Sequence, residues 1–378
     1  MFFIVLLSHL IILLTVPCTV LSQHDTNRPK ARTVVYWGQS GGGVIDNNNL
    51  ASYCTPDSGI DVIVLAFLYQ YGNGITIPSG TFGQNFCSVD TSGNPSNCDD
   101  LSSSIAICKS KGVKIILSLG GASGAYSLSS QQEAETIGQN LWDAYGAGNG
   151  TIPRPFGSNV IDGWDFDIEA SSGNQYYQYL IKKLRSNFNS GDFVITGAPQ
   201  CPIPEPNMQQ IITTSQFDYL WVQFYNNPCS VNSNINFNDW VSNVANTPSA
   251  KAKIFIGVPA SPRGATGTDS GAQYYLEPSA LNTLVGQYKT NHAFGGIMMW
   301  AAGFSDNNIV NGCTYAQQAH HILQNGSPCE SSRPINATNT TLFTSRETSV
   351  FPTPSPSPTT SASSGIGKVP QWGQVSTQ

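Results

Sequence analysis

A stretch near the middle of the chain places acidic side chains at every second position. From Asp165 to Glu169 the sequence reads Asp-Phe-Asp-Ile-Glu, and Asp162-Gly163-Trp164 precedes it. Successive side chains of an extended strand point to opposite faces, so Asp165, Asp167 and Glu169 share one face. Closely spaced carboxyls in a poorly solvated place repel one another, which raises the pKa of at least one of them. The pattern predicts a general acid, and we assign that role to Glu169, at the end of the row.

Three interpretations of this stretch are open. A strand on the surface of a sheet would place the acids in water and the alternating apolar side chains in the core. A calcium loop would also be acidic, but its usual glycine follows the acids and it lacks interleaved aromatic residues. A strand of a closed barrel would point the acids inward and pack Trp164, Phe166 and Ile168 against an outer ring of helices. The other strands of the chain favour this third interpretation.

Short apolar runs recur along the chain, with helical stretches between them. We expect strands at residues 33–37, 62–67, 114–119, 163–169, 193–197, 219–224, 253–258 and 295–300. We expect helices at 101–111, 131–145, 174–187, 237–244, 278–288 and 314–323. Continuous β-branched and aromatic runs are typical of parallel strands that are covered on both faces. The order predicts an α/β fold, a (β/α)8 TIM barrel; a doubly wound open sheet is the second choice, since no Gly-rich phosphate loop is present.

In a barrel of this kind the active site forms at the carboxyl ends of the strands. Acid, amide and aromatic groups gather there: Tyr36, Trp37, Gln39, Phe67, Ser118, Gly120, Asp167, Glu169, Gln200, Gln223, Tyr225, Asn226 and Trp300. Amides and aromatic faces suit a neutral, polar, ring-shaped ligand, and carbohydrate is the first choice. The charge balance agrees, because charged residues make up 11% and the net charge is -6. A nucleic-acid-binding surface would need clustered Lys and Arg.

The two ends of the chain differ in composition from the part between them. Residues 2–16 form an apolar run that Pro17 interrupts, which predicts a signal peptide over residues 1–22. A membrane anchor is the alternative, although the run is short for a span of ~20 residues. Residues 23–330 are expected to form the catalytic barrel. Residues 331–378 are rich in Ser, Thr and Pro and are expected to form a disordered tail.

The cysteines and glycosylation motifs favour a secreted protein. Nine cysteines are present; Cys18 lies in the predicted signal, and an even number remains. An even count in an exported chain implies disulfides, for which eight cysteines allow ~105 pairings. The absence of a Cys-x-x-Cys pair argues against a zinc site. Acceptor sites for N-glycosylation begin at Asn149, Asn325, Asn336 and Asn339.

Six separate blocks, in order, resemble the fungal and plant (hevamine-like, class III) subgroup of family-18 glycoside hydrolases, the chitinases. The blocks are Tyr36-Trp37-Gly38-Gln39, Ser118-Leu119-Gly120-Gly121, Asp162-Gly163-x-Asp165-x-Asp167-x-Glu169, Ala198-Pro199-Gln200-Cys201-Pro202, Gln223-Phe224-Tyr225-Asn226-Asn227 and Trp300. The resemblance extends from about Thr33 to Leu323 and leaves the tail uncovered. It departs from the family's usual pattern at Trp164 and in the loops 40–50 and 259–269.

The resemblance implies an endochitinase that retains anomeric configuration through substrate-assisted catalysis. Glu169 would protonate the glycosidic oxygen, and the sugar's own N-acetyl oxygen would attack C1 to give an oxazolinium ion. Asp167 would hold the acetamido N–H, Asp165 would share a proton with Asp167, and Tyr225 would donate to the acetamido oxygen. Trp300 would form the floor of the subsite. The other substrate-binding residues would be Tyr36, Gly120, Gln223 and Asn226.

The resemblance also implies the pairings Cys54–Cys108, Cys87–Cys98 and Cys201–Cys229, which leaves Cys313–Cys329 by elimination. It calls for no cofactor and no metal. The expected partners are chitin and chitin oligosaccharides, with no nucleic acid and no membrane, and the protein is expected to be an extracellular monomer, with cell-wall association an open option. Two other functions are open: an endo-β-N-acetylglucosaminidase that acts on glycoprotein glycans, and a catalytically silent sugar-binding or storage protein on the same barrel.

Overall fold

The computed structural model describes residues 30–39, 46–84 and 86–330. Apart from Lys30, they belong to one compact unit that begins at Ala31. The expected signal peptide, the expected tail and the acceptor sites at Asn336 and Asn339 lie outside the described residues. No helix in the described ranges combines the length and the apolar character that a membrane span requires.

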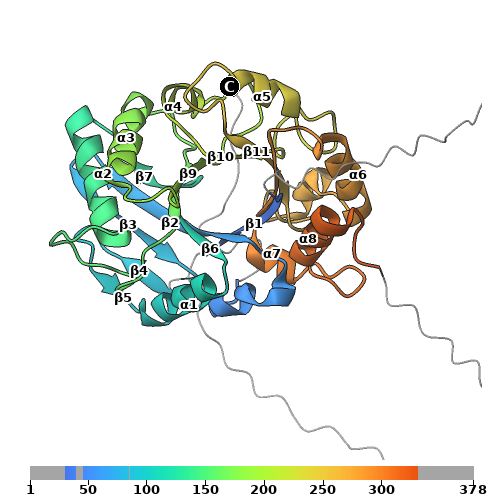
Figure 1. Ribbon diagram of the computed structural model, residues 1–378, viewed down its shortest axis with the longest axis horizontal. Coiled ribbons are helices and arrows are strands. Elements are labelled where there is room, and N and C mark those ends of the chain that lie inside the picture. The colour runs from blue at the N-terminus through green and yellow to red at the C-terminus, as the bar shows by residue number, and fades with distance from the viewer. Residues whose placement is uncertain (1–29, 40–45, 85, 331–378) are drawn as a thin grey trace, which may run out of the picture. The chain divides into compact units, whose positions relative to one another are not determined.

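Eight parallel strands form a closed barrel with helices around it (Figure 1). Each strand pairs with the next, and β1 pairs with both β2 and β12, so Val34 lies beside Val62 on one side and Met298 on the other. The (β/α)8 prediction is confirmed, and the open doubly wound sheet is wrong. The barrel strands are β1 (Arg32–Trp37), β2 (Val62–Gly72), β6 (Lys114–Gly120), β8 (Gly163–Asp167), β9 (Val194–Gly197), β10 (Tyr219–Gln223), β11 (Lys253–Pro259) and β12 (Phe294–Trp300).

Six of the α-helices form at or within a few residues of the expected ranges. The Ser130 side chain caps its helix by accepting from the Glu133 N–H, and Thr314 with Gln317 forms a capping box. The sequence did not predict two short helices, α4 (Gln209–Thr214) and α7 (Ala302–Asp306), because a helix of one or two turns is too short to show an apolar period. The α-helices are α1 (Asp99–Ser110), α2 (Gln131–Tyr145), α3 (Tyr177–Asn187), α4 (Gln209–Thr214), α5 (Phe237–Val244), α6 (Pro278–Tyr288), α7 (Ala302–Asp306) and α8 (Tyr315–Asn325).

Strand β2 continues beyond the barrel and forms a wall at its mouth. It pairs with β3 (Ile75–Phe82), which pairs in turn with β4 (Cys87–Val89), and β4 with β5 (Pro95–Ser96); β7 (Ala125–Tyr126) also joins β2. The expected strand 62–67 was too short because the hairpin was missed. Its turn is Asn73-Gly74, with both residues at positive φ. This dipeptide is the strongest short-range hairpin signal in a sequence.

An aspartate just before a strand ties it to its neighbour at three places around the barrel. Asp61, Asp162 and Asp218 precede β2, β8 and β10. The backbone N–H of each donates to the carbonyl of the second residue of the adjacent strand, at 3.0, 2.7 and 2.8 Å. In return each carboxylate accepts the N–H of that same residue, at 2.8 Å in every case. Asp162, the first acid of the motif, therefore has a structural role at the end of β8 opposite Glu169.

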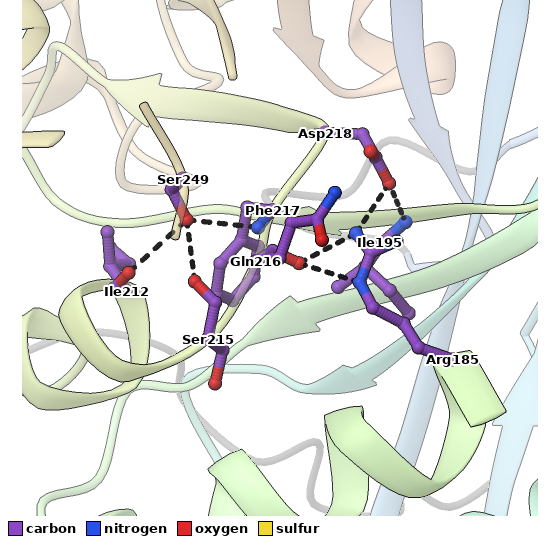
Figure 2. A network of polar contacts seen from close by, with 8 residues as sticks. All are labelled: Arg185, Ile195, Ile212, Ser215, Gln216, Phe217, Asp218 and Ser249. Atoms are coloured by element: carbon purple, nitrogen blue, oxygen red, sulfur yellow. Dashed lines mark hydrogen bonds and ion pairs between the residues drawn. The ribbon is translucent and has the colours of Figure 1, made fainter. Parts of the chain in front are cut away.

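Figure 2 shows the network around Asp218. The Arg185 guanidinium donates to the Asp218 carboxylate at 2.8 Å and to the Gln216 carbonyl. Beside it the buried Ser249 hydroxyl donates to the Ser215 carbonyl at 2.7 Å and accepts from the Phe217 N–H. These bonds satisfy backbone groups where the chain turns from α4 into β10, at the amino end of the strand. This end of a barrel contributes stability, while the opposite end carries the active site.

Aromatic packing and disulfides join the barrel to its outer layer. Trp164 is fully buried and lies against Trp142 of α2, Phe188 and Phe193, so it faces the helices. The described residues contain four disulfides, namely the three pairs that the resemblance implies and the fourth that was left by elimination: Cys54–Cys108, Cys87–Cys98, Cys201–Cys229 and Cys313–Cys329. The third of these joins the loops that follow β9 and β10, at the mouth of the barrel.

Candidate active site

The acidic row begins inside the barrel and ends at its mouth. Asp165 is 0% and Asp167 4% exposed, and Trp164 and Phe166 pack outward, so the alternation is as expected. Strand β8 ends at Asp167 and not at Glu169, because the last paired residues of β6 and β8 are Gly120 and Asp167. Glu169 follows two residues later, beyond the strand pairing.

Asp165 lies at the centre of a polar cluster that four other strands supply. Its Oδ2 accepts from the Tyr36 hydroxyl at 2.7 Å and from Ser118 Oγ at 2.6 Å. Its Oδ1 accepts from Thr196 Oγ1 and from Trp221 Nε1, each at 2.7 Å. Burial raises the pKa of Asp165, whereas these four hydrogen bonds lower it. Four donors around one carboxylate favour its ionised form.

Asp167 lies between the other two acids of the row, and their charges act on it. Burial raises its pKa well above the ordinary value, and the charges of Glu169, Asp165 and Glu205 raise it further. Its Oδ1 accepts from Gln223 Nε2 at 3.0 Å, and no hydrogen bond joins it to Asp165. The expectation that the two aspartates share a proton therefore stays a prediction.

Glu169 has a raised pKa, and its carboxyl has no hydrogen-bond partner among the described residues. Burial, and then the charge of Glu205, raise its pKa from 4.5 to about 7. Within the described part of the chain, no group hydrogen-bonds its carboxyl, whereas its backbone N–H donates to the Tyr126 hydroxyl at 2.9 Å. A carboxylic acid that is protonated near neutral pH and has no partner in the protein can donate to a bound ligand.

The charges of Asp167 and Glu169 affect the pKa of the Tyr225 hydroxyl. It is 6% exposed, and burial raises the pKa of its hydroxyl well above the ordinary value, with further contributions from Asp167 and Glu169. The phenol therefore stays neutral and can donate a hydrogen bond beside the row. The structure thus brings Tyr225, from the end of β10, together with the two outer acids of β8.

Three aromatic rings line the mouth next to the row. The rings of Phe67 and Trp300 are stacked with centroids 6.0 Å apart, and Tyr36 lies 5.6 Å from Trp300. Trp300 is the partly exposed member of the group, whereas Tyr36 and Phe67 are buried. Phe67 was among the strand-end residues but not among the expected substrate-binding residues. The buried rings of Tyr36 and Phe67 therefore support Trp300, whose exposed part is an apolar surface of the kind against which the C–H face of a sugar packs.

Three further expected binding residues make contacts within the protein. Gln223 Nε2 donates to Asp167 and, at 2.9 Å, to the Ala198 carbonyl, so this amide orients the acid. Asn226 is exposed, and its Nδ2 donates to the Ala265 carbonyl at 2.9 Å, which joins the loops after β10 and β11. Gly120 has φ +113°, and a Cβ there would lie 2.1 Å from the Asp167 carbonyl oxygen. Glycine at this position lets β6 approach β8. A direct role of any of the three in substrate binding stays a prediction.

Glu205, in the loop after β9, is a fourth buried acid that the sequence did not reveal. Its carboxylate accepts from the backbone N–H groups of Gln200, at 3.2 Å, of Asn207, at 2.7 Å, and of Met208. Burial raises its pKa and these hydrogen bonds lower it. Its charge reaches both Asp167 and Glu169. It lies outside any strand, so the alternation rule could not identify it.

Asp46 joins the first and last strands of the barrel at the mouth. Its two oxygens accept from the Gly38 N–H at 2.6 Å and from the Gly303 N–H at 2.5 Å. Gly38 follows β1, and Gly303 lies just after Trp300 in α7. Burial raises the pKa of Asp46 from 3.8 to about 6. The contacts of this loop could not be predicted, because its Asn- and Gly-rich sequence has no periodicity.

The raised pKa values of Glu169 and Asp46 make the protein more stable in acid than at neutral pH. Both groups hold a proton more tightly when folded than when unfolded, so their contribution is fully present below about pH 4 and is lost as pH rises through 6 to 7. We expect the Tm to fall between pH 4.5 and 7.5, with Glu169 contributing on the order of 3 kcal/mol. Calorimetry across this range tests the expectation. Glu169→Gln should show a smaller fall, and equal falls in both proteins would contradict the assignment.

The chain is similar to known proteins over most of its length. Residues 32–305 match the family model described as glycosyl hydrolases family 18. Endochitinase 2 of Metarhizium robertsii is 60% identical over 335 residues, which cover 85% of this chain and 80% of that protein.

Two solved plant structures share the fold. A chitinase from Ipomoea carnea superposes with a TM-score of 0.61 at 34% identity, covering 75% of this chain and 97% of that chain. A xylanase and alpha-amylase inhibitor protein from Scadoxus multiflorus gives a TM-score of 0.60 at 31% identity, covering 77% and 98%. The second of these proteins is named as an inhibitor, so the fold by itself does not decide the activity. The activity has to be inferred from the side chains at the mouth of the barrel.

Proposed function

Because the chain belongs to glycosyl hydrolase family 18, we propose that it is an endochitinase that hydrolyses β-1,4 bonds between N-acetylglucosamine units of chitin. The observation that carries this proposal is the complete acid row, in which Glu169 has a raised pKa and an unoccupied carboxyl beside Tyr225. The fungal relative that is 60% identical is itself named an endochitinase.

The reaction that we propose retains the anomeric configuration and uses the substrate's own acetamido group. Glu169 gives its proton to the glycosidic oxygen as the C1–O bond breaks, and the acetamido carbonyl oxygen forms a bond to C1 from the opposite face. The product of this step is an oxazolinium ion. Water then attacks C1, the bond to the acetamido oxygen breaks, and the Glu169 carboxylate takes the proton of that water. Two inversions give net retention.

Asp167 and Tyr225 act on the acetamido group in this scheme. The amide N–H needs an acceptor and its carbonyl oxygen needs a donor, and these two residues supply them. As the oxazolinium ion forms, the positive charge that develops next to Asp167 favours the ionised form of this acid, and the carboxylate stabilises the ion. Four donors hold the buried Asp165 carboxylate in place and so orient the inner end of the row. Gln223 holds Asp167 from the side.

Trp300, backed by the buried rings of Tyr36 and Phe67, gives the reacting sugar a floor. Stacking on Trp300 would place C1 of the sugar above the acid row. Burial of sugar C–H groups on an indole ring supplies apolar binding energy without a charge, which suits a neutral polymer.

We also propose that the enzyme acts outside the cell as a monomer, with residues 1–22 as a secretion signal and 331–378 as a Ser/Thr/Pro-rich tail. Four disulfides and similarity to fungal endochitinases support an extracellular enzyme. Asn149 and Asn325 are the glycosylation acceptor sites within the described residues.

Product analysis on chitin oligomers of increasing length tests the proposal. We expect internal cleavage and a product whose new reducing end is first seen by NMR as the β-anomer. Initial release of the α-anomer would contradict substrate assistance. Cleavage of glycoprotein glycans but not of chitin oligomers would indicate an endo-β-N-acetylglucosaminidase. Tight binding of oligomers with no released product would indicate a silent sugar-binding protein.

A further inference from the structure

The general acid proposed above lies where the barrel no longer holds the backbone. The pairing of β6 with β8 ends at Gly120 and Asp167, and one further bond runs from the Gly121 N–H to the Asp167 carbonyl at 2.8 Å. On the other side, the pairing of β8 with β9 ends at Phe166 and Gly197. Glu169 comes after both. Its carboxyl has no partner in the described part of the chain, so its position depends on how its backbone is held.

The hydroxyl of Tyr126 holds the backbone of Glu169. The Glu169 N–H donates to Tyr126 Oη at 2.9 Å, and the same hydroxyl donates to the Gly121 carbonyl at 2.8 Å. The direction of both bonds is certain, because a backbone N–H can only donate and a carbonyl can only accept. The single phenol proton is therefore committed to Gly121. One hydroxyl thus bridges the ends of β6 and β8 where their own pairing has stopped.

Tyr126 is itself fixed by the wall that β2 builds at the mouth. Tyr126 pairs with Tyr71 where β7 joins β2. The two rings are stacked, with centroids 5.5 Å apart and an angle of 15° between the ring planes. The Tyr71 hydroxyl in turn makes a 2.8 Å hydrogen bond with the hydroxyl of Tyr177, the first residue of α3. Tyr126 is 6% exposed. A buried phenol held in this way has little freedom to move.

We infer that Tyr126 is a positioning residue for catalysis, whose hydroxyl takes the place of a strand partner and sets the height of Glu169 above the acid row. The inference rests on the proposed function, since it assigns Tyr126 to the same acid. A catalytic role for the phenol itself is excluded by geometry, because its proton is donated to Gly121 and its oxygen faces the Glu169 N–H. Burial raises the pKa of Tyr126, so the bridge persists throughout the working pH range.

Removing the hydroxyl should affect the chemical step more than binding. Without it the Glu169 N–H loses its partner, and the segment that carries the acid is free to shift. A displacement of ~1 Å at a reacting group costs up to about 100-fold in rate. We expect Tyr126→Phe to lower kcat on chitin oligomers about 10- to 100-fold with KM within about threefold, because the lost positioning matters in the transition state.

The matched control is Tyr315→Phe. Tyr315 is a buried tyrosine at the start of α8, and its hydroxyl donates to the Leu276 backbone carbonyl at 2.7 Å, outside the group that holds Tyr126. We expect its kcat to stay within about threefold of the wild type, with a similar loss of Tm, because each change removes one tyrosine hydroxyl that is hydrogen-bonded in the interior. Both variants are assayed below their own unfolding midpoints.

Amide exchange and a replacement residue give readouts that a general loss of stability would not move. By NMR or mass spectrometry, the Glu169 amide should exchange faster in Tyr126→Phe and not in Tyr315→Phe. Incorporation of 4-aminophenylalanine at position 126, whose amino group can donate to Gly121 and accept from Glu169, should restore part of the lost kcat.

Two results would overturn the inference. One is a Tyr126→Phe enzyme with wild-type kcat and wild-type exchange at Glu169. The other is an equal loss of kcat in Tyr126→Phe and Tyr315→Phe, which would indicate a structural role alone. Failure of the wild-type enzyme to cleave any chitin oligomer would instead refute the proposed function, and the exchange measurement would still test the contact.

Discussion

Glu169→Gln is expected to lower kcat for chitin oligomers by about 10²–10⁴-fold and to leave their binding nearly unchanged. Gln has the shape of the protonated acid, so the contacts of the bound sugar are kept, but it has no proton to give to the leaving oxygen. The wild type should also lose activity as pH rises through about 7, where Glu169 loses its proton. This alkaline limb of the kcat/KM profile should be absent from the residual activity of the variant.

The control for this substitution is Glu135→Gln. Glu135 lies in α2, and its carboxylate accepts a hydrogen bond from Gln131 of the same helix at 2.8 Å. The same chemical change is made there, outside the mouth of the barrel, and should leave kcat unaltered. Near-normal turnover by Glu169→Gln, together with intact folding, would refute the assignment of the general acid.

Asp167→Asn is expected to lower kcat by about 10²–10³-fold for a different reason. The variant keeps the size of the side chain but cannot supply the negative charge that stabilises the developing oxazolinium ion. Its amide can also turn its NH2 group toward Gln223 Nε2, which now donates to Asp167 Oδ1, and two donors would then face each other. The exposed Asp239 of α5 offers the matched control, Asp239→Asn, which should behave as the wild type.

An activated substrate separates the two roles. A nitrophenyl glycoside leaves as a stabilised phenolate and needs little help from a general acid. Glu169→Gln should therefore lose at least about tenfold less activity on this substrate than on chitin oligomers. Asp167→Asn should lose about the same on both, because the oxazolinium ion forms in each case. Equal rescue of the two variants would contradict the division of roles.

Local patterns were enough to identify much of the fold. All eight expected strands are present, and α2, α5 and α6 begin and end where the sequence predicted. The alternation around Asp165 placed its side chain inside and that of Trp164 outside, against the helices. The hairpin at Asn73-Gly74 carried a clear signal that was missed. Short elements such as α4 had no readable signal, since they contain too few residues to show a period.

The hydrogen bonds and charges around each acid were harder to predict from the sequence. A period-2 pattern could have identified Trp221, because it shares one face of β10 with the expected site residue Gln223, whereas β9, which carries Thr196, contains no expected site residue. Nothing in the sequence indicated that both donate to Asp165, because that depends on strand register. The end of β8 at Asp167 also depends on its neighbours, which stop pairing there.

The sequence by itself determined the eight strands, six of the helices between them and the row of acids that shares one face, because these follow from the period of the backbone. The tertiary structure alone decided how the acids differ: four donors surround Asp165, Glu205 lies within electrostatic range of Glu169, and Tyr126 holds the acid beyond the end of its strand. The physical reason is that burial, charge and hydrogen bonding at these sites come from residues that are distant in the chain and meet only when the barrel closes.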